Sequence, residues 1–332
     1  MKKFENSIKD FVAKRNSDKI LFTAGPSSIT EANINGLRPC FGRGDHDYEN
    51  LEKRVLDKLK KLSGHSQLAR MQGSASLALE IMIVNFLYGK VLLIDTGFYS
   101  QRLYSIINSS LMHKNHNFKN VQVVNWKNIN EVKGKFDWVV SCYTETSCGL
   151  KLPIKFLQKT SEKLSAKLML DATASIGLEE NHKIAEVIAY SSCKGLFGLT
   201  GAAFIAFNEF PENKVDSFYL NLNNHLEKKM TGPYHQICSM DFILENYSFY
   251  KSAVLNNKKI FVEKYKENLI YPLDYQPQLC TYVNFKIKSL DNRAILYHPR
   301  SNLDGSVVCH LGEVHLGNNA KGDILNSIGK DS

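Results

Sequence analysis

The amino-acid sequence predicts an α/β protein with a ligand site at the carboxyl ends of its strands. Three short apolar runs, typical of buried strands, follow one another within residues 167–208. The first run ends in Asp171, and the second is followed closely by Lys194. Because open α/β sheets bind ligands at this edge, we expect Asp171 and Lys194 to face the same site.

A lysine and an aspartate in these places favour one kind of chemistry, although either residue alone at a strand end is usually structural or solvated. A lysine among apolar and hydroxyl-bearing neighbours can form a Schiff base with a carbonyl group. An aspartate behind it can hold the ring nitrogen of a pyridoxal cofactor, which then acts as an electron sink. The pair therefore predicts Lys194 as the covalent anchor and Asp171 as the partner of the ring.

Length and composition set the general class of the protein. The chain has 332 residues, 43% of them apolar, so it can bury a large core and is expected to hold one large and one smaller domain. The formal net charge is +9, but the lysines are spread out and not interleaved with aromatic residues. We therefore expect no nucleic-acid partner, and solvated charged faces with some attraction for anionic substrates.

Cysteine usage and hydropathy predict a cytoplasmic protein without a bound metal. The seven cysteines are an odd number and include no C-x-x-C pair, which favours reduced thiols and argues against a structural zinc. The first residues lack the apolar core and the cleavage site of a signal peptide. No run approaches the roughly 18 apolar residues that cross a bilayer, so we expect no membrane partner.

Six short motifs follow one another along the chain. They are Thr23-Ala24-Gly25-Pro26, Gln72-Gly73-Ser74-Ala75-Ser76, Thr96-Gly97-Phe98-Tyr99, Glu145-Thr146-Ser147-Cys148-Gly149, Asp171 and Lys194. No single motif is specific, but in this order and with nearly this spacing they resemble the class V aminotransferases, and the similarity runs from about Leu21 to Gly317. This is a pyridoxal-phosphate family of fold type I that contains the alanine–glyoxylate and 2-aminoethylphosphonate–pyruvate transaminases.

The resemblance implies a large domain with a mostly parallel seven-stranded sheet between two layers of helices, followed by a small α/β domain. On this basis we expect an N-terminal helix or arm over residues 1–20, a cofactor-binding domain over 21–255 and a small domain over 256–332. One helix is expected from about Ile237 to Asn256. The small domain is expected to be shortened, because residues 288–293 leave little room for a full helix.

The resemblance also implies which residues hold the cofactor phosphate. Ser74, Ala75 and Ser76 open an apolar helix, whose N–H groups and dipole attract an anion. Such a turn can equally be a simple helix cap, and the family more often has a glycine at the place of Ala75. Thr231 matches a threonine that reaches the phosphate of the neighbouring subunit, which implies a homodimer with shared sites. The alternative is that Thr231 only caps the following helix.

Two further positions match residues that contact the cofactor ring. Tyr99 matches an aromatic side chain stacked on the face of the ring. Thr146 matches a hydroxyl that contacts the ring oxygen. The resemblance gives Lys194 the role of moving a proton between substrate and cofactor, and gives Asp171 the role of keeping the ring nitrogen protonated.

Substrate contacts are less well defined. By resemblance Ala24 and Gly25 lie over the site, although this turn can also be a simple strand end. The residue at the place of the carboxylate-binding arginine is Val307, and valine cannot grip a carboxylate. Three explanations stay open: Arg300 or Arg43 supplies the guanidinium, the acceptor lacks the usual carboxylate arrangement, or transamination has been lost.

The sequence therefore predicts an aminotransferase that uses pyridoxal 5′-phosphate and a Lys194 Schiff base. Its donor is expected to be a small, anionic amine resembling 2-aminoethylphosphonate, and its acceptor a 2-oxo acid such as pyruvate. Two alternatives are a pyridoxal-phosphate lyase or decarboxylase, which needs no carboxylate-binding arginine, and a non-catalytic protein that retains the fold.

Overall fold

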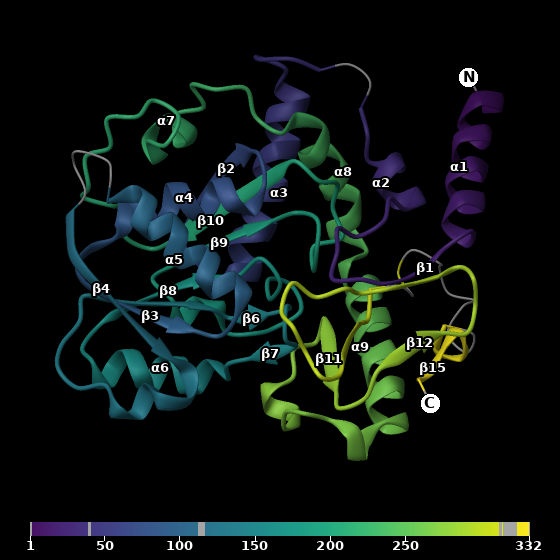
Figure 1. Cartoon of the computed structure of the whole chain (residues 1–332). Helices are drawn as coiled ribbons and strands as arrows, with labels where there is room; N and C mark the ends of the chain where they lie inside the picture. The colour runs from purple at the N-terminus through teal and green to yellow at the C-terminus, as the bar shows by residue number, and fades with distance from the viewer. Residues whose placement is uncertain (1, 39–40, 112–116, 312–313, 315–323, 332) are drawn as a thin grey trace.

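A seven-stranded sheet forms the centre of the larger part of the molecule (Figure 1). The structure is a computed structural model and describes residues 2–38, 41–111, 117–311, 314 and 324–331. The strand order is β2-β10-β9-β8-β5-β3-β4, with β10 antiparallel to both of its neighbours and all other pairs parallel. The strands are β2 (Gln67–Gln72), β3 (Tyr88–Asp95), β4 (Asn117–Asn125), β5 (Trp138–Cys142), β8 (Lys167–Asp171), β9 (Val187–Ser191) and β10 (Ala202–Phe207).

Both faces of this sheet are covered by helices because successive strand residues point to opposite sides. In β8, Leu168 and Leu170 pack with one helical layer and Met169 packs with the other. The first layer consists of α3 (His46–Ser63), α6 (Ile154–Lys163) and α8 (Tyr234–Glu245). The second consists of α4 (Ala75–Phe86), α5 (Phe98–Ser110) and α7 (Leu222–Leu226). This arrangement confirms the predicted three-layer α/β architecture.

The C-terminal part is built from short strand pairs beside one long helix, α9 (Tyr247–Lys264). Two of the pairs are antiparallel, and residues 288–293 contain no helix, as expected. The third pair joins the N-terminal strand β1 to β13 in parallel register. The strands are β1 (Ile20–Phe22), β11 (Cys280–Val283), β12 (Ile287–Ser289), β13 (Ala294–Leu296), β14 (Ser306–Cys309) and β15 (Ile328–Lys330).

The prediction of one helix from about Ile237 to Asn256 was wrong. The segment forms α8 and α9, which meet at Asn246. Asn246 has φ −106° and ψ 20°, outside the α-helical region, so the helix is interrupted there although apolar residues continue on both sides.

The remaining elements are the N-terminal helix α1 and several short segments. Helix α1 (Lys2–Ser17) stands at one side of the molecule, next to α2 (Glu31–Asn35) (Figure 1). Strands β6 (Thr144–Glu145) and β7 (Leu150–Lys151) form a hairpin at the carboxyl edge of the sheet. The 3-10 helices are η1 (Trp126–Glu131), η2 (His182–Ile184), η3 (Lys266–Asn268), η4 (Leu273–Tyr275) and η6 (Leu325–Ser327).

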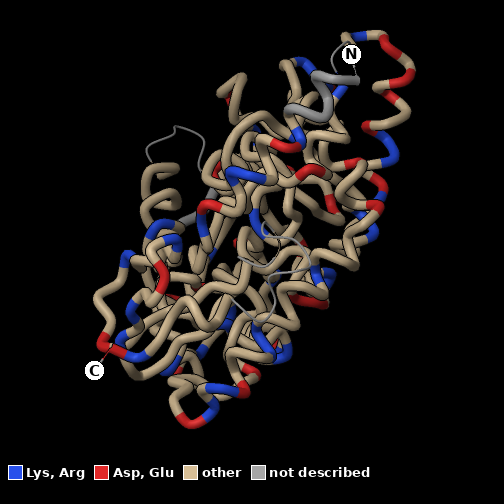
Figure 2. Tube along the Cα trace, turned by 90° about the vertical axis from the view of Figure 1, so that its right-hand side faces the viewer, with Lys and Arg blue, Asp and Glu red and all other residues tan. Residues whose placement is uncertain are grey.

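Charged residues of both signs are interspersed along the chain (Figure 2). Within the ranges that the structure describes, no helix combines the length and the apolar character that crossing a membrane requires.

Candidate active site

Asp171 and Lys194 line one cavity, at the edge of the sheet where the sequence places them. Asp171 is the last residue of β8, and Lys194 follows the end of the neighbouring parallel strand β9 by three residues. The cavity has a volume of about 230 Å³. Asp171 is 5% exposed, so its carboxylate faces the cavity from a largely buried position.

The amino end of α4 forms another wall of this cavity, through Ser74, Ala75 and Ser76. Ser74 is the first flanking residue of the helix, but its hydroxyl makes no capping hydrogen bond. The backbone N–H groups of Ala75 and Ser76 belong to the first turn, where a helix offers no carbonyl partner. Three hydroxyl or N–H groups and a helix dipole therefore face the cavity, as a phosphate group requires.

Tyr99 supplies an aromatic face within the same cavity. The Nζ atom of Lys194 lies 5.5 Å from the centre of the Tyr99 ring. Thr144, Thr146 and Thr173 also line the cavity, and the buried Oγ1 atoms of Thr144 and Thr173 have no hydrogen-bond partner among the described residues, whereas Thr146 interacts with Tyr297. Buried hydroxyls without partners are rare in proteins and indicate that a polar ligand completes the site.

Glu145 holds Tyr99 in place, a role that sequence reasoning did not assign. The Glu145 carboxylate is buried and accepts hydrogen bonds from the N–H groups of Tyr99 (2.9 Å), Ser100 (3.2 Å) and Ser147 (3.2 Å). Burial raises the pKa of Glu145, and these donors oppose that shift. The carboxylate thus fixes the start of α5, from which Tyr99 projects.

Arg102 is a second residue that sequence reasoning missed. It lies one helical turn after Tyr99 on α5 and lines the cavity beside Asp171. Its Nη2 atom is 3.3 Å from Asp171 Oδ2. The signal in the sequence was the i, i+3 spacing from Tyr99, which places both side chains on one face of a helix.

The turn after β1 closes the cavity on the side of Lys194. Gly25 lines the cavity, and Ala24 is buried next to it. Gly25 has φ +113°, and a Cβ atom there would lie only 3.1 Å from Lys194 Cγ, so this position requires glycine. The N–H group of Ser27 donates to the carbonyl of Cys193 at 2.8 Å, which ties the turn to the lysine segment.

The two candidate arginines lie in different environments. Arg300 is exposed, and its guanidinium carbon lies 5.1 Å from the centre of the Phe98 ring, next to Tyr99. Arg43 is exposed on the segment before α3. Neither residue lines the cavity that contains Lys194.

Thr231 is also exposed and lies outside that cavity. The alternative that Thr231 caps the following helix is wrong, because the capping position of α8 is Pro233 and the helix starts at Tyr234.

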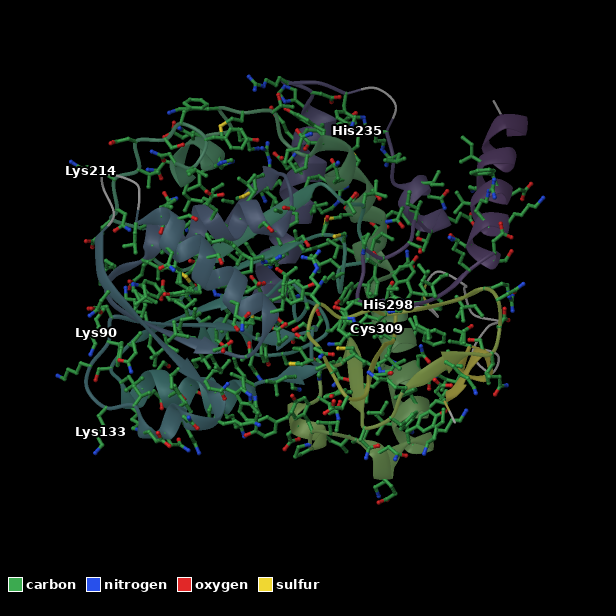
Figure 3. The ribbon with its side chains drawn as sticks, in the orientation of Figure 1. Lys90, Lys133, Lys214, His235, His298 and Cys309 are labelled. Atoms are coloured by element: carbon green, nitrogen blue, oxygen red, sulfur yellow. The ribbon has the colours of Figure 1, made fainter. Side chains whose placement is uncertain are left out.

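The position of the expected carboxylate-binding arginine is buried and apolar. Val307 is 2% exposed and pairs with Tyr282 across β11 and β14. Cys309, labelled in Figure 3, follows two residues later and is fully buried. The predicted closing motif runs on through Gly312 and Glu313, which lie outside the described residues.

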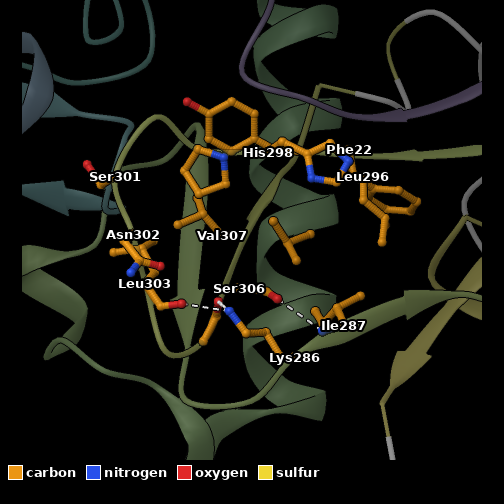
Figure 4. A pocket seen from close by; sticks show the side chains of 14 residues that line it. Phe22, Lys286, Ile287, Leu296, His298, Ser301, Asn302, Leu303, Ser306 and Val307 are labelled. Carbon is orange, nitrogen blue, oxygen red and sulfur yellow. Dashed lines mark hydrogen bonds between the residues drawn. The ribbon is translucent and has the colours of Figure 1, made fainter.

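Segment 297–303 runs beside Val307 (Figure 4). Residues of this segment and Val307 line a cavity of about 280 Å³. Lys286 Nζ donates to the carbonyls of Leu303 (2.6 Å) and Gly305 (3.3 Å) and anchors the end of the segment. Tyr297, at its start, has its pKa raised by burial and by the neighbouring Tyr99, which places it close to the cofactor cavity.

The residues of the Lys194 cavity fit pyridoxal phosphate. Lys194 offers a primary amine, Asp171 a carboxylate, α4 a helix terminus and Tyr99 an aromatic face. The hydroxyl groups without partners supply donors for a ring oxygen or a phosphate. The donor set fits pyridoxal phosphate, and the fold matches the type I fold.

Comparison with known proteins points to the same class. An uncharacterized aminotransferase of Methanocaldococcus jannaschii is 26% identical over 255 residues, which cover 68% of this chain and 64% of the relative. The 2-aminoethylphosphonate–pyruvate transaminase of Pseudomonas aeruginosa is 25% identical over 252 residues, 69% of this chain and 68% of the relative. The chain thus spans about two thirds of the length of these relatives.

Solved structures agree in fold. Alanine–glyoxylate aminotransferase of Nostoc sp. superposes with a TM-score of 0.75 at 15% identity, over 92% of this chain and 93% of that one. No protein-family model matches the chain. The relatives and this structure confirm the predicted resemblance to the class V aminotransferases and the type I fold.

Proposed function

We propose that the protein is a pyridoxal-phosphate-dependent aminotransferase that moves an amino group from a small amine to a 2-oxo acid. One observation carries this proposal: Lys194 and Asp171, at the carboxyl ends of adjacent parallel strands, line one cavity with the amino end of α4. An amine, a carboxylate and an anion-binding helix terminus within one cavity match the three polar parts of the cofactor. The similarity to named aminotransferases supports the same activity.

Each residue of the site has a defined task in this proposal. Lys194 would hold the cofactor covalently and, once released, would carry a proton at its Nζ atom as base and then as acid. Asp171 would accept the N–H of the ring nitrogen. Tyr99 would cover one face of the ring, and Thr146 would contact the ring oxygen. When bound, the cofactor supplies an electron sink for the substrate carbon.

The proposed active site is shared between two copies of the chain. Ser74, Ala75 and Ser76 would bind the cofactor phosphate from within one copy. Thr231 is exposed and does not line the cavity of its own chain, and the resemblance implies that it reaches the phosphate of a neighbouring copy. We therefore propose a homodimer. Light scattering on the purified protein tests this, and the molar mass of a single chain at micromolar concentration would rule it out.

We propose a small, anionic amine resembling 2-aminoethylphosphonate as the donor and pyruvate as the acceptor. The relative from Pseudomonas aeruginosa supports this choice. Val307 leaves the carboxylate of the 2-oxo acid without a guanidinium at that position, so the proposal requires another cation to bind it. Arg300, on the segment beside Val307, is the proposed contact for the anionic group of the substrate.

The decisive experiment is an absorbance spectrum of the protein loaded with pyridoxal phosphate. Loading should produce a visible band that Lys194→Ala lacks. Adding 2-aminoethylphosphonate should remove the band, and pyruvate should restore it with formation of alanine.

Two other outcomes would point elsewhere. Consumption of the amine without any 2-oxo acid would indicate a lyase or decarboxylase. Absence of a visible band at saturating cofactor would contradict the enzyme proposal and favour a non-catalytic protein with this fold.

A further inference from the structure

Arg102 lies on the wall of the cofactor cavity and takes part in no role assigned above. It projects from α5 one turn after Tyr99, and 28% of its side chain is exposed, through the cavity. The guanidinium carbon is 4.8 Å from the centre of the Tyr99 ring, within the range of a cation–π contact. Lys194 Nζ, at 5.5 Å, is the second cation near this ring.

The polar contacts of Arg102 converge on one carboxylate. Its Nη2 atom is 3.3 Å from Asp171 Oδ2, whereas its Nε atom is buried without a hydrogen-bond partner among the described residues. The arginine therefore makes a single hydrogen bond to Asp171 and not the two parallel bonds of which a guanidinium is capable. At this place of the guanidinium the Nε–H group is buried without a partner, which lowers the free energy of unfolding.

Asp171 needs such a partner because its carboxylate is nearly buried. Oδ1 accepts a hydrogen bond from the N–H of Thr173 at 2.9 Å, and the Cys142 thiol lies 3.8 Å from Oδ2. Among the described residues, Arg102 is the only cationic side chain within 4 Å of this carboxylate. A buried charge without a counter-charge is strongly unfavourable, so removing Arg102 would favour a displaced Asp171 side chain.

We propose that Arg102 is a positioning residue that holds the Asp171 carboxylate directed into the cavity, ready for the ring nitrogen of the cofactor. The inference rests on the proposed cofactor site and extends it. Thr173 holds one carboxylate oxygen from the backbone, and Arg102 holds the other from α5. Arg102 acts at the Asp171 end of the cavity, away from the turn at Gly25 that closes the Lys194 side.

A double-mutant cycle on cofactor affinity tests this inference without any substrate. Arg102→Gln is made in the natural chain and in Asp171→Asn, and the dissociation constant of pyridoxal phosphate is measured by titrating cofactor-free protein. We expect about tenfold weaker binding in the natural background and less than a twofold change in the Asp171→Asn background. Arg102→Lys, which keeps a cation, should restore most of the affinity.

Arg54→Gln is the matched control. Arg54 also pairs with an aspartate, Asp241, at 3.1 and 2.6 Å, but it lies on α3 outside the cavity. We expect this variant to bind the cofactor like the natural chain. The thermal unfolding midpoint of each cofactor-free variant separates lost affinity from lost folding.

Several results would overturn the inference. Equal weakening by Arg102→Gln in both backgrounds would mean that Arg102 acts through Tyr99 or directly on the cofactor, and not through Asp171. Unchanged affinity of Arg102→Gln, or no rescue by Arg102→Lys, would remove the positioning role while leaving the proposed function intact. Failure of the natural chain to bind pyridoxal phosphate would overturn both.

Discussion

The two ends of the candidate active site are built in different ways. At the cofactor end, Asp171 and Lys194 follow adjacent parallel strands of a sheet that helices cover on both faces. At the substrate end, Val307 lies on a two-stranded sheet beside the irregular segment 297–303. Parallel strands bring their carboxyl ends to one edge by topology, so short motifs are sufficient to place the cofactor residues. No such constraint acts on the substrate end, and there the chain departs from the pattern of its resemblance.

Packing reinforces this difference. The side chains of the central strands are almost all fully buried between two helical layers, and a core of this kind has few ways to rearrange. Segment 297–303 instead lines a cavity of about 280 Å³ and is anchored by polar contacts such as Lys286 to the Leu303 carbonyl. The cofactor end is therefore expected to be rigid, and the substrate end to tolerate change.

The largest expected effect concerns the cofactor end. Lys194→Ala should abolish the visible band of the loaded protein and reduce kcat on the order of 10³-fold or more, because it removes the covalent anchor and the proton carrier together. Absorbance spectroscopy and single-turnover kinetics check this result.

Lys167→Ala is the control for that prediction. Lys167 is at the opposite end of β8, and its partner is the exposed Glu209, at 2.7 Å. An exposed ion pair of this kind contributes little to the free energy of unfolding. The absorbance of the visible band and kcat should therefore stay within about twofold of their values for the natural chain. A visible band in Lys194→Ala that the amine removes would contradict the assignment of the lysine.

The sequence was informative where topology decides. The apolar runs ending at Asp171 and near Lys194 were sufficient to predict their shared edge, because runs this short, followed by small residues, favour buried strands over helices. Arg102 and Glu145 were missed for a physical reason. Their roles depend on what they contact in another element, Asp171 in one case and the start of α5 in the other. The i, i+3 spacing places Arg102 on the same helix face as Tyr99, but it does not show that this face meets Asp171.

The division of the helix at Asn246 was missed for a similar reason. Apolar residues continue from α8 into α9, so hydrophobic periodicity contains no stop signal there. Arg43 and Arg300 could not be ranked from the sequence either, because the position of an irregular segment depends on packing and not on periodicity.

The next prediction concerns Lys258, a buried lysine outside the candidate active site. Lys258 of α9 is 8% exposed, and its Nζ atom donates to the carbonyls of Gln276 (3.1 Å) and Pro277 (2.9 Å). Burial lowers the pKa of Lys258 to about 8 from the ordinary 10.5; Lys151 adds to this shift, whereas Glu179 opposes it.

Between pH 8 and 10.5 the unfolded chain therefore binds more protons at this lysine than the folded chain does. The free energy of unfolding should rise with pH across this window, by roughly 3 kcal/mol relative to Lys258→Met. Urea unfolding of both proteins at several pH values measures this difference. Lys259→Met changes the adjacent exposed lysine, which pairs with Glu263, and should leave the pH dependence unaltered. If the free energy of unfolding changed with pH in the same way for the natural chain and for Lys258→Met, the lowered pKa of Lys258 would be contradicted.

The smallest predicted effect is the one that best tests the substrate end. Arg300 lies on the ring of Phe98, beside Tyr99, whereas Arg43 is exposed before α3. Arg300→Ala should raise the KM for an anionic donor about tenfold with little change in kcat, since a hydrogen bond to a charged group contributes on the order of 1.5–3 kcal/mol. Arg43→Ala should change neither constant by more than about twofold. With a neutral amine as donor, the KM should be the same for both variants and the natural chain.

A raised KM for the anionic donor in Arg43→Ala alone would assign the anion to the segment before α3. Unchanged constants in both variants would mean that the substrate end selects its amine without a guanidinium, and that the loss of arginine at Val307 has no replacement elsewhere.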